Sequence, residues 1–275
     1  MLARLTITPR TLLRRLTRAG ALTFVFAGAI SASSTTSAAD RGVTQATQVL
    51  KGTPMDHADV LSLMNEMKQA YSRVSDYTAT FVKRERVKGR LRPREVMFIK
   101  FAEPFNIYTR WMQGKHEGQE LIYAKGWNGG KIRAHTGSFP DITVDLDPEG
   151  SLATRGQRHP ITDFGLGIMI NLLARDVTLA GARPQDTVTY LDLGISKIAG
   201  ATVRCIEATT PPARWSPYYA HRARICINTR THMPVRVLIW DRDDHLLEDY
   251  TYKNIRLNVG LTDLDFSPDN PEYGF

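Results

Sequence analysis

Cysteine is nearly absent from this 275-residue sequence, which contains only two. No apolar run reaches the length of about 20 residues that a membrane-spanning helix needs. The sequence also has no Walker loop, no Rossmann fingerprint and no Gly-x-Ser-x-Gly motif. These absences exclude a disulfide-dense scaffold and a helical membrane domain, and they give no support to a nucleotide-binding enzyme or a serine hydrolase.

Acidic residues are absent from the first 39 positions, where five arginines precede or border an apolar stretch at residues 21–30. Small residues follow and end at Ala39. A basic start, a short apolar run and a small-residue stretch together predict a cleavable signal peptide over residues 1–39, and therefore a periplasmic protein. An uncleaved membrane anchor is the alternative. The Arg14–Arg15 pair leaves both the Sec and the twin-arginine export routes open.

The net charge of +8 suggests at first a nucleic-acid or anionic-membrane partner. Cleavage after Ala39 removes five arginines and no acid, which leaves 236 residues with a net charge of +3. That charge is ordinary for this length, so we expect no nucleic-acid partner.

Cys205 and Cys226 both belong to the mature chain. In an oxidising compartment, two cysteines predict one disulfide, here across two neighbouring strand-like runs. Two buried free thiols remain the alternative, because the alternation of the runs does not clearly place both side chains on one face.

The hydrophobic period divides the mature chain into one helix followed by strands. Residues 40–55 are small and polar and predict a flexible lead-in. Residues 56–74 carry apolar side chains at three- and four-residue steps, which predicts an amphipathic helix capped by Asp56. From residue 76 onward the period becomes two, which predicts a single domain over residues 56–275 built mainly from strands.

Turn residues separate the predicted strands without intervening helices, so the pairing should be antiparallel. Residues 137–160 predict a long loop, and residues 163–175 a helix that acts as a lid. We therefore expect an α+β, mainly β fold: a curved antiparallel half-barrel whose concave face is covered by the N-terminal helix and the mid-chain lid helix. The ten predicted strands are residues 77–82, 95–101, 107–112, 119–124, 131–135, 187–193, 203–208, 223–228, 235–241 and 248–255.

Several strings resemble the lipoprotein carriers LolA and LolB. They include SDYTATF at residues 75–81, IKFAEPF at 99–105 followed by RWM at 110–112, and the closing segment at 233–268. This resemblance implies a half-barrel whose apolar hollow holds acyl chains. The carriers have an arginine before the proline of the second strand, where this chain has Glu103. That departure puts true lipoprotein shuttling in doubt.

More specific strings are similar to DUF1571, a family of secreted bacterial proteins of unknown function. They are FVKRER at residues 81–86, GQE at 118–120, GGK at 129–131 with His135, DPEG at 147–150 and RHPIT at 158–162. This resemblance indicates membership of a family but implies no particular activity.

A lipid-binding hollow would use apolar side chains on the first helix and on the inward strand faces, since flexible thioethers suit variable hydrocarbon. An ordinary core between helix and sheet is the competing interpretation. The predicted hollow residues are Met64, Met67, Tyr71, Met97, Ile99, Phe101, Trp111, Leu238 and Trp240.

An enzyme would have to use the histidines and carboxylates around the predicted lid. His135, Asp145, Asp147 and His159 show no tight ligand spacing, so we expect no catalytic residue, no metal and no cofactor. We expect instead that Arg158, His159 and the acids of the DPEG motif hold the lid in place through hydrogen bonds. The predicted lid and motif residues are Arg110, His135, Asp147, Arg158 and His159.

The sequence thus predicts a monomeric, non-enzymatic periplasmic protein that binds a lipid or a lipidated protein, with a membrane-associated donor or acceptor as a further partner. The basic run at residues 83–92 could contact anionic headgroups, although a solvated hairpin tip explains it as well. An envelope-stress sensor or scaffold that binds a protein partner is the alternative function, and a metal- or His-dependent hydrolase is a weaker one.

Overall fold

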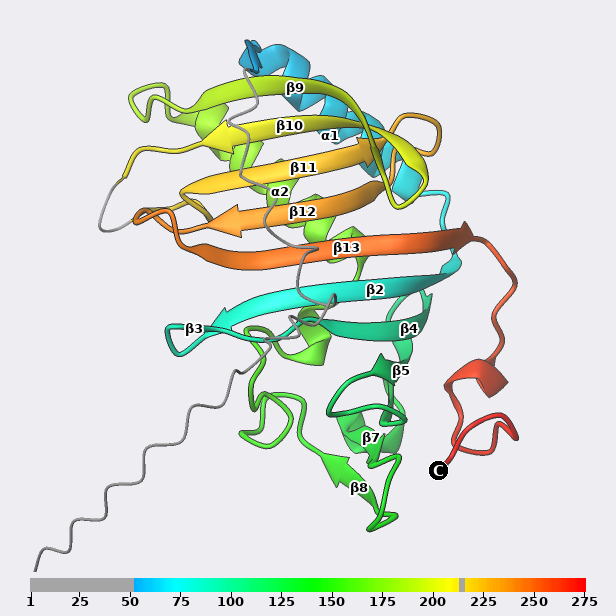
Figure 1. Ribbon diagram of the computed structural model, residues 1–275. Coiled ribbons are helices and arrows are strands. Elements are labelled where there is room, and N and C mark those ends of the chain that lie inside the picture. Colours follow the sequence, from blue (N-terminus) through cyan, green and yellow to red (C-terminus); the bar gives the residue numbers. More distant parts are fainter. Residues whose placement is uncertain (1–51, 213–215) are drawn as a thin grey trace, which may run out of the picture. The chain divides into compact units, whose positions relative to one another are not determined.

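The computed structural model describes residues 52–212 and 216–275. The predicted signal peptide, residues 1–39, and most of the predicted lead-in lie outside these residues. In the described chain, thirteen strands form one antiparallel sheet (Figure 1). The strands are β1 (Thr53–Pro54), β2 (Asp76–Val87), β3 (Arg90–Leu91), β4 (Glu95–Ala102), β5 (Asn106–Gln113), β6 (Glu120–Ala124), β7 (Ile132–His135), β8 (Thr143–Leu146), β9 (Thr189–Ile198), β10 (Ala201–Thr209), β11 (Arg222–Asn228), β12 (Pro234–Trp240) and β13 (Leu246–Leu257).

The strand order is β1-β9-β10-β11-β12-β13-β2-β4-β5-β6-β7-β8, with β3 paired only to β2. Each series of consecutive strands forms a meander, and the pairing of β13 with β2 joins the two series in the middle of the sheet. The two ends, β1 and β8, do not pair with each other among the described residues, so the sheet is open and curved. This confirms the predicted half-barrel.

Alternation along the strands decides which side chains face the core. In β4 the buried residues are Met97, Ile99 and Phe101, and the residues between them are only partly buried. Because successive side chains point to opposite faces of a sheet, one face of β4 is almost wholly apolar. This face is the concave one.

Both α-helices lie on the same face of the sheet (Figure 1). Helix α1 (His57–Tyr71) and helix α2 (Leu166–Ala182) also pack against each other. A Cβ atom on Gly167 would lie 2.4 Å from the Tyr71 ring, so glycine permits the close approach of the two helices. Short 3₁₀ helices η2 (Asn128–Gly130), η3 (Ile161–Asp163) and η4 (Asp263–Phe266) complete the secondary structure.

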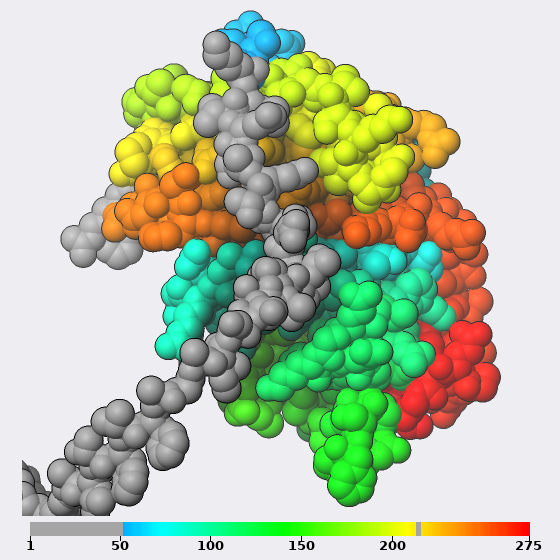
Figure 2. Space-filling model, in the orientation of Figure 1, coloured from blue at the N-terminus to red at the C-terminus, as the bar shows by residue number. Residues whose placement is uncertain are grey.

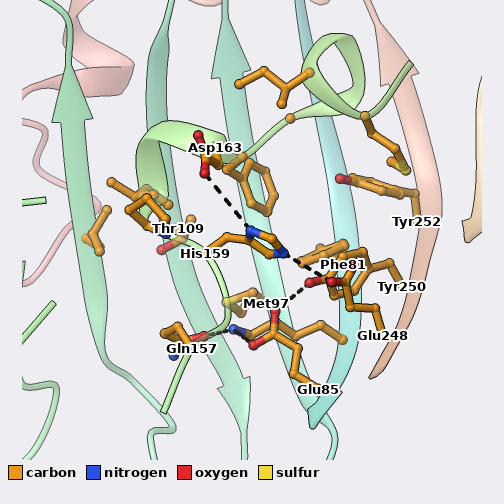
Figure 3. A pocket seen from close by; sticks show the side chains of 18 of the residues that line it. Phe81, Glu85, Met97, Thr109, Gln157, His159, Asp163, Glu248, Tyr250 and Tyr252 are labelled. Carbon is orange, nitrogen blue, oxygen red and sulfur yellow. Dashed lines mark hydrogen bonds and ion pairs between the residues drawn. The ribbon is translucent and has the colours of Figure 1, made fainter. Parts of the chain in front are cut away.

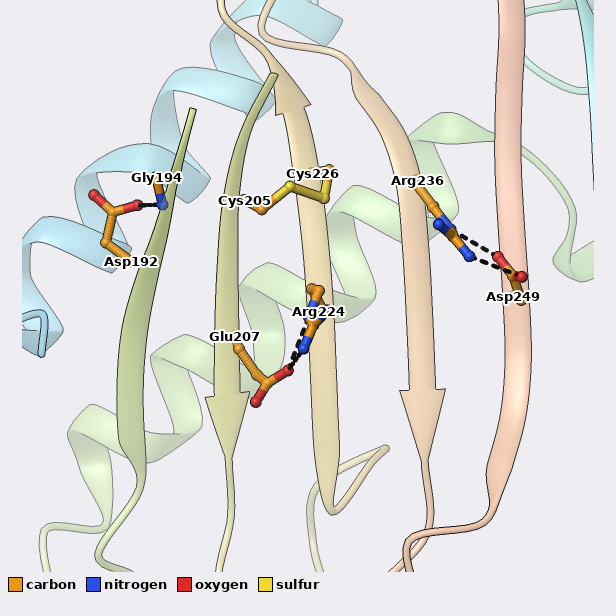
Figure 4. Close-up of a disulfide and its surroundings, with 8 residues drawn as sticks. All are labelled: Asp192, Gly194, Cys205, Glu207, Arg224, Cys226, Arg236 and Asp249. Atoms are coloured by element: carbon orange, nitrogen blue, oxygen red, sulfur yellow. Dashed lines mark hydrogen bonds and ion pairs between the residues drawn. A yellow bond between two sulfur atoms is a disulfide. The ribbon is translucent and has the colours of Figure 1, made fainter. Parts of the chain in front are cut away.

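The opposite, outer face carries the disulfide between Cys205 and Cys226, which lie directly across β10 and β11 (Figure 4). The same face carries ion pairs between neighbouring strands, such as Arg236 with Asp249, 2.9 Å apart. The C-terminal segment covers another part of this face (Figure 2), where Tyr273 stacks on Tyr108 with ring centroids 3.9 Å apart.

Several predicted boundaries are wrong. Helix α2 was predicted over residues 163–175, but it begins at residue 166 and continues to residue 182. Its N-cap is Gly165, whose φ of +123° suits glycine, and no described side chain caps this end of the helix. Asp56 is the N-cap of α1, but its side chain makes no capping hydrogen bond.

Two predicted irregular segments also contain strands. The lead-in predicted over residues 40–55 is ordered at its end, where β1 pairs with β9. The loop predicted over residues 137–160 contains β8. Among the described helices, none combines the length and the apolar character that crossing a membrane requires.

Candidate functional site

A cavity of about 340 Å³ lies between the concave face of the sheet, one flank of α2 and the segment of residues 153–165 (Figure 3). We call it the pocket. Its volume is at the lower end of the range of about 300–1,000 Å³ that is typical of small-molecule sites. Its walls are mainly apolar. The apolar side chains come from the sheet and from α2 with the segment before it: Phe81, Met97, Trp111, Leu121, Ile132, Tyr252, Ile161, Phe164, Ile168, Met169, Leu172 and Leu173.

Two of the predicted hollow residues, Met97 and Trp111, line the pocket. The others on this face belong to the packed core beside it. Met67, Ile99 and Phe101 are buried among helix and strand side chains. The concave face therefore contains both a packed core and a pocket. That the pocket binds lipid stays a prediction.

The remaining two predicted hollow residues, Leu238 and Trp240, lie on the wrong face. Trp240 pairs with Arg222 across β11 and β12, and the Arg222 guanidinium lies 3.9 Å from its ring centroid. Leu238 pairs with Arg224 and shares that outer face. Both faces of β12 are rich in apolar side chains, so hydrophobicity alone does not distinguish the inward face.

One end of the pocket is polar and is centred on Glu248, which is 2% exposed. Its Oε1 accepts hydrogen bonds from Arg158 Nε at 2.7 Å, Tyr219 OH at 2.5 Å and His159 Nε2 at 3.1 Å. Figure 3 shows His159 between this carboxylate and Asp163, whose Oδ2 lies 4.0 Å from His159 Nδ1. Residues 153–165 cover the pocket, and we call them the pocket-covering segment. The bonds from Arg158 and His159 attach this segment to β13.

A second buried carboxylate, Glu85, lies directly across from Glu248 in the β2–β13 pair. It accepts hydrogen bonds from Tyr250 OH at 2.5 Å and from the backbone N–H of Arg158 at 3.2 Å. Lys83 Nζ lies 3.6 Å from Glu85 and donates a hydrogen bond to Gln157. Strand β2 thus holds the pocket-covering segment as well.

Burial and these hydrogen bonds set the charges of the polar end. The hydrogen bond with Glu248 raises the pKa of His159 above its usual value, although burial opposes it. Burial alone would raise the pKa of Glu248, but its hydrogen bonds with His159 and Tyr219 outweigh this and lower it. Burial and the nearby Glu248 carboxylate raise the pKa of Tyr219. The lowered pKa favours the anionic form of Glu248, the raised pKa of His159 favours its cationic form, and the raised pKa of Tyr219 keeps it neutral.

The predicted lid and motif residues do not form one site. Arg158 and His159 lie at the pocket, and Glu149 Oε1 of the predicted DPEG motif accepts a hydrogen bond from Thr162 Oγ1 at 3.0 Å. Asp147 Oδ1 only accepts the backbone N–H of Glu149 within its own turn.

Two further motif residues lie on the outer face of the sheet. Arg110 Nε is 3.6 Å from Glu120 there. His135 pairs with Glu120 across β6 and β7 and contacts Asp141. His135 and His159 therefore lie on opposite faces of the sheet and do not share a site.

Sequence reasoning missed Glu85, Glu248, Tyr219 and Tyr250. A signal for Glu85 exists, because the inward alternation of Tyr77, Ala79 and Phe81 continues to it. An acid at the inward position of an apolar strand indicates a buried polar site.

The fold is an open, curved antiparallel sheet with two helices on its concave face. The pocket with a polar end is its candidate site. The chain belongs to the DUF1571 family, a family of proteins of unknown function, whose model matches residues 74–275.

No curated protein matches the chain. Among solved structures, the lipoprotein LppX of Mycobacterium tuberculosis is similar at 13% identity and a TM-score of 0.45, covering 75% of this chain and 99% of LppX. A LolA superfamily protein from Nitrosomonas europaea is similar at 12% identity and a TM-score of 0.35, covering 76% and 97%. A chain of the Pseudomonas aeruginosa MucA/MucB complex is similar at 13% identity and a TM-score of 0.43, covering 76% and 60%.

Proposed function

We propose that the mature protein is an exported, non-enzymatic binding protein that holds one small amphiphilic lipid in the pocket. The pocket itself carries this proposal, since its apolar walls end in a cluster of hydrogen-bonded polar groups. Hydrocarbon would lie along Met97, Trp111 and the α2 flank, and the polar part of the ligand would lie towards His159. The volume suits one acyl chain better than a lipid with two or three.

The disulfide supports export, because disulfides persist in oxidising compartments such as the periplasm. The basic start of the sequence supports the same location. We infer a monomer that receives its ligand from, or delivers it to, a membrane-associated partner. The function needs no catalytic residue, metal or cofactor.

The test is to purify the mature protein from cells, extract it with organic solvent and identify bound lipids by mass spectrometry. In parallel, the delipidated protein is titrated with the fluorescent probe N-phenyl-1-naphthylamine. We expect a co-purifying amphiphile and a saturable rise in probe fluorescence. Reproducibly empty protein that leaves the probe dark would overturn lipid binding and favour the protein-partner alternative.

A matched pair of variants locates the binding. Leu172→Trp adds bulk on the α2 wall of the pocket and should weaken probe binding about tenfold, which corresponds to about 1.4 kcal/mol. Ile195→Trp adds the same side chain at an exposed position on β9. It should bind the probe like the wild type. Equal binding by both variants would place the probe elsewhere.

A further inference from the structure

One hydroxyl group in the pocket wall has no hydrogen-bond partner among residues 52–212 and 216–275. Thr109 lies in the middle of β5, is 1% exposed, and lines the pocket (Figure 3). Its Oγ1 is one of three buried side-chain polar atoms that find no partner within the described residues. A buried hydroxyl without a partner destabilises the fold, so such a group calls for an explanation.

The side chains directly across from Thr109 in the sheet are apolar. Its direct neighbours across the adjacent strands are Ile99 on β4 and Leu121 on β6. Rotation about the Cα–Cβ bond by one staggered step moves the hydroxyl into the position that the methyl group or the hydrogen atom occupied, so the hydroxyl can be turned towards the pocket. A ligand in the pocket is therefore the available source of a hydrogen bond.

The charges at the polar end are already paired. Glu248 is held by Arg158 and His159, and Lys83 lies between Glu85 at 3.6 Å and Glu95 at 3.4 Å. An anionic headgroup would have to compete with these carboxylates for their cations. An uncharged headgroup can bind without separating any buried ion pair.

We propose, on the basis of the proposed function, that the pocket selects a single-chain amphiphile whose acyl chain is joined through an uncharged ester or amide, and that the Thr109 hydroxyl recognises the carbonyl oxygen. Thr109 is then a specificity-determining residue. The selection follows from one hydroxyl in an otherwise apolar wall, because hydrocarbon alone cannot pair with it.

The test compares 1-dodecanoylglycerol, an ester, with 1-O-dodecylglycerol, an ether that lacks the carbonyl oxygen. Both are used below their critical micelle concentrations to displace N-phenyl-1-naphthylamine from the full mature protein. The wild type should bind the ester about fivefold more tightly, as one neutral hydrogen bond allows. Dodecanoate at pH 8 should bind more weakly than the ester.

Thr109→Val keeps the shape of the side chain and removes the hydroxyl. It should lose the preference for the ester while its affinity for the ether stays the same. Thr109→Ser should retain the preference. Probe binding by all three proteins confirms that the variants are folded.

The outcomes separate this inference from the proposed function. The proposed role of Thr109 is wrong if the wild type binds the probe but binds the ester and the ether equally. It is also wrong if Thr109→Val keeps the preference for the ester. In both cases the proposed lipid binding is unaffected. Tighter binding of dodecanoate than of the ester would refute the uncharged headgroup. If neither glycerol lipid nor the probe binds, both proposals fail.

Discussion

The two halves of the concave face are built from the same kinds of residues but are packed differently. We call them the helix-covered half and the pocket half. In the helix-covered half, α1 and α2 together bury the inward side chains of β9–β12, and a cavity of only about 50 Å³ remains. In the pocket half, the flank of α2 and residues 153–165 face β13, β2 and β4–β7, and the cavity is about 340 Å³.

The comparison shows that the hollow arises from the covering elements and not from the sheet. Inward strand residues are large and apolar in both halves, such as Ile225 and Ile239 in one and Met97 and Trp111 in the other. A second helix fills the helix-covered half. The pocket half is closed instead by an irregular segment that is held at Glu85 and Glu248.

We expect the largest effect on stability when two buried methionines, one in each half, are replaced by alanine. Met67 of α1 is 0% exposed in the helix-covered half, and Met97 of β4 is 4% exposed on the pocket wall. Met67→Ala should cost about 2–5 kcal/mol of unfolding free energy, because it opens a new cavity in close packing. Met97→Ala should cost less, because part of its side chain already faces empty space.

Urea unfolding of the delipidated proteins under identical conditions measures both values. The two side chains are the same size, so the difference reports packing once the preference of alanine for helix over strand is subtracted. An equal loss in both variants would mean that the pocket half is as tightly packed as the helix-covered half.

The polar end of the pocket predicts a pH dependence that the helix-covered half should lack. The raised pKa of His159 means that its stabilising bond to Glu248 is fully present below about pH 6.5 and is lost as the pH rises through the folded-state pKa. The lowered pKa of Glu248 makes its contribution present above about pH 4.3, to be lost as the pH falls through its folded-state value.

His159→Gln should therefore be less stable than the wild type by about 1–2 kcal/mol near pH 6, and the difference should shrink towards pH 9. The groups facing His159 are Glu248, Glu85, Arg158, Tyr219 and Asp163. His116→Gln, in the exposed turn between β5 and β6, is the control and should show no such trend. A pH-independent difference for His159→Gln would contradict the charged bond.

The sequence predicted the pattern of strands well, because alternation acts over a few neighbouring residues. The strand expected at residues 95–101 is β4, one residue longer. Alternation also directs Met97 and Trp111 inward with their neighbours. Local periodicity does not identify which of two apolar faces is inward, which is why Leu238 and Trp240 were misplaced.

The polar end of the pocket could not be predicted from the sequence, for a different reason. Glu248 follows a turn of charged residues and is typical of a solvated position when it is considered alone. Its burial depends on three partners that are 29 to 90 residues away in the chain: Arg158, His159 and Tyr219. Such a cluster exists only once β13 pairs with β2 and the pocket-covering segment folds over both strands.

We expect the smallest effect on stability when two buried threonines, one in each half, are replaced by valine. Thr109 in the pocket half has an unpaired hydroxyl, whereas Thr210 in the helix-covered half donates a hydrogen bond to the Ala220 carbonyl at 3.0 Å. Thr109→Val replaces an unsatisfied polar atom with a methyl group and should raise the Tm of the ligand-free protein by about 2–4 °C, which corresponds to about 1 kcal/mol. Thr210→Val leaves a carbonyl without its donor and should lower the Tm by a similar amount.

Differential scanning calorimetry of the delipidated variants measures both shifts. Opposite signs for the same substitution would show that the Thr109 hydroxyl destabilises the ligand-free protein, whereas the Thr210 hydroxyl stabilises it. Selection for stability alone would remove such a group, so its presence is expected where a ligand supplies the missing bond. A fall in Tm for Thr109→Val as large as that for Thr210→Val would mean that the Thr109 hydroxyl is satisfied within the protein, and the two halves would not differ in this respect.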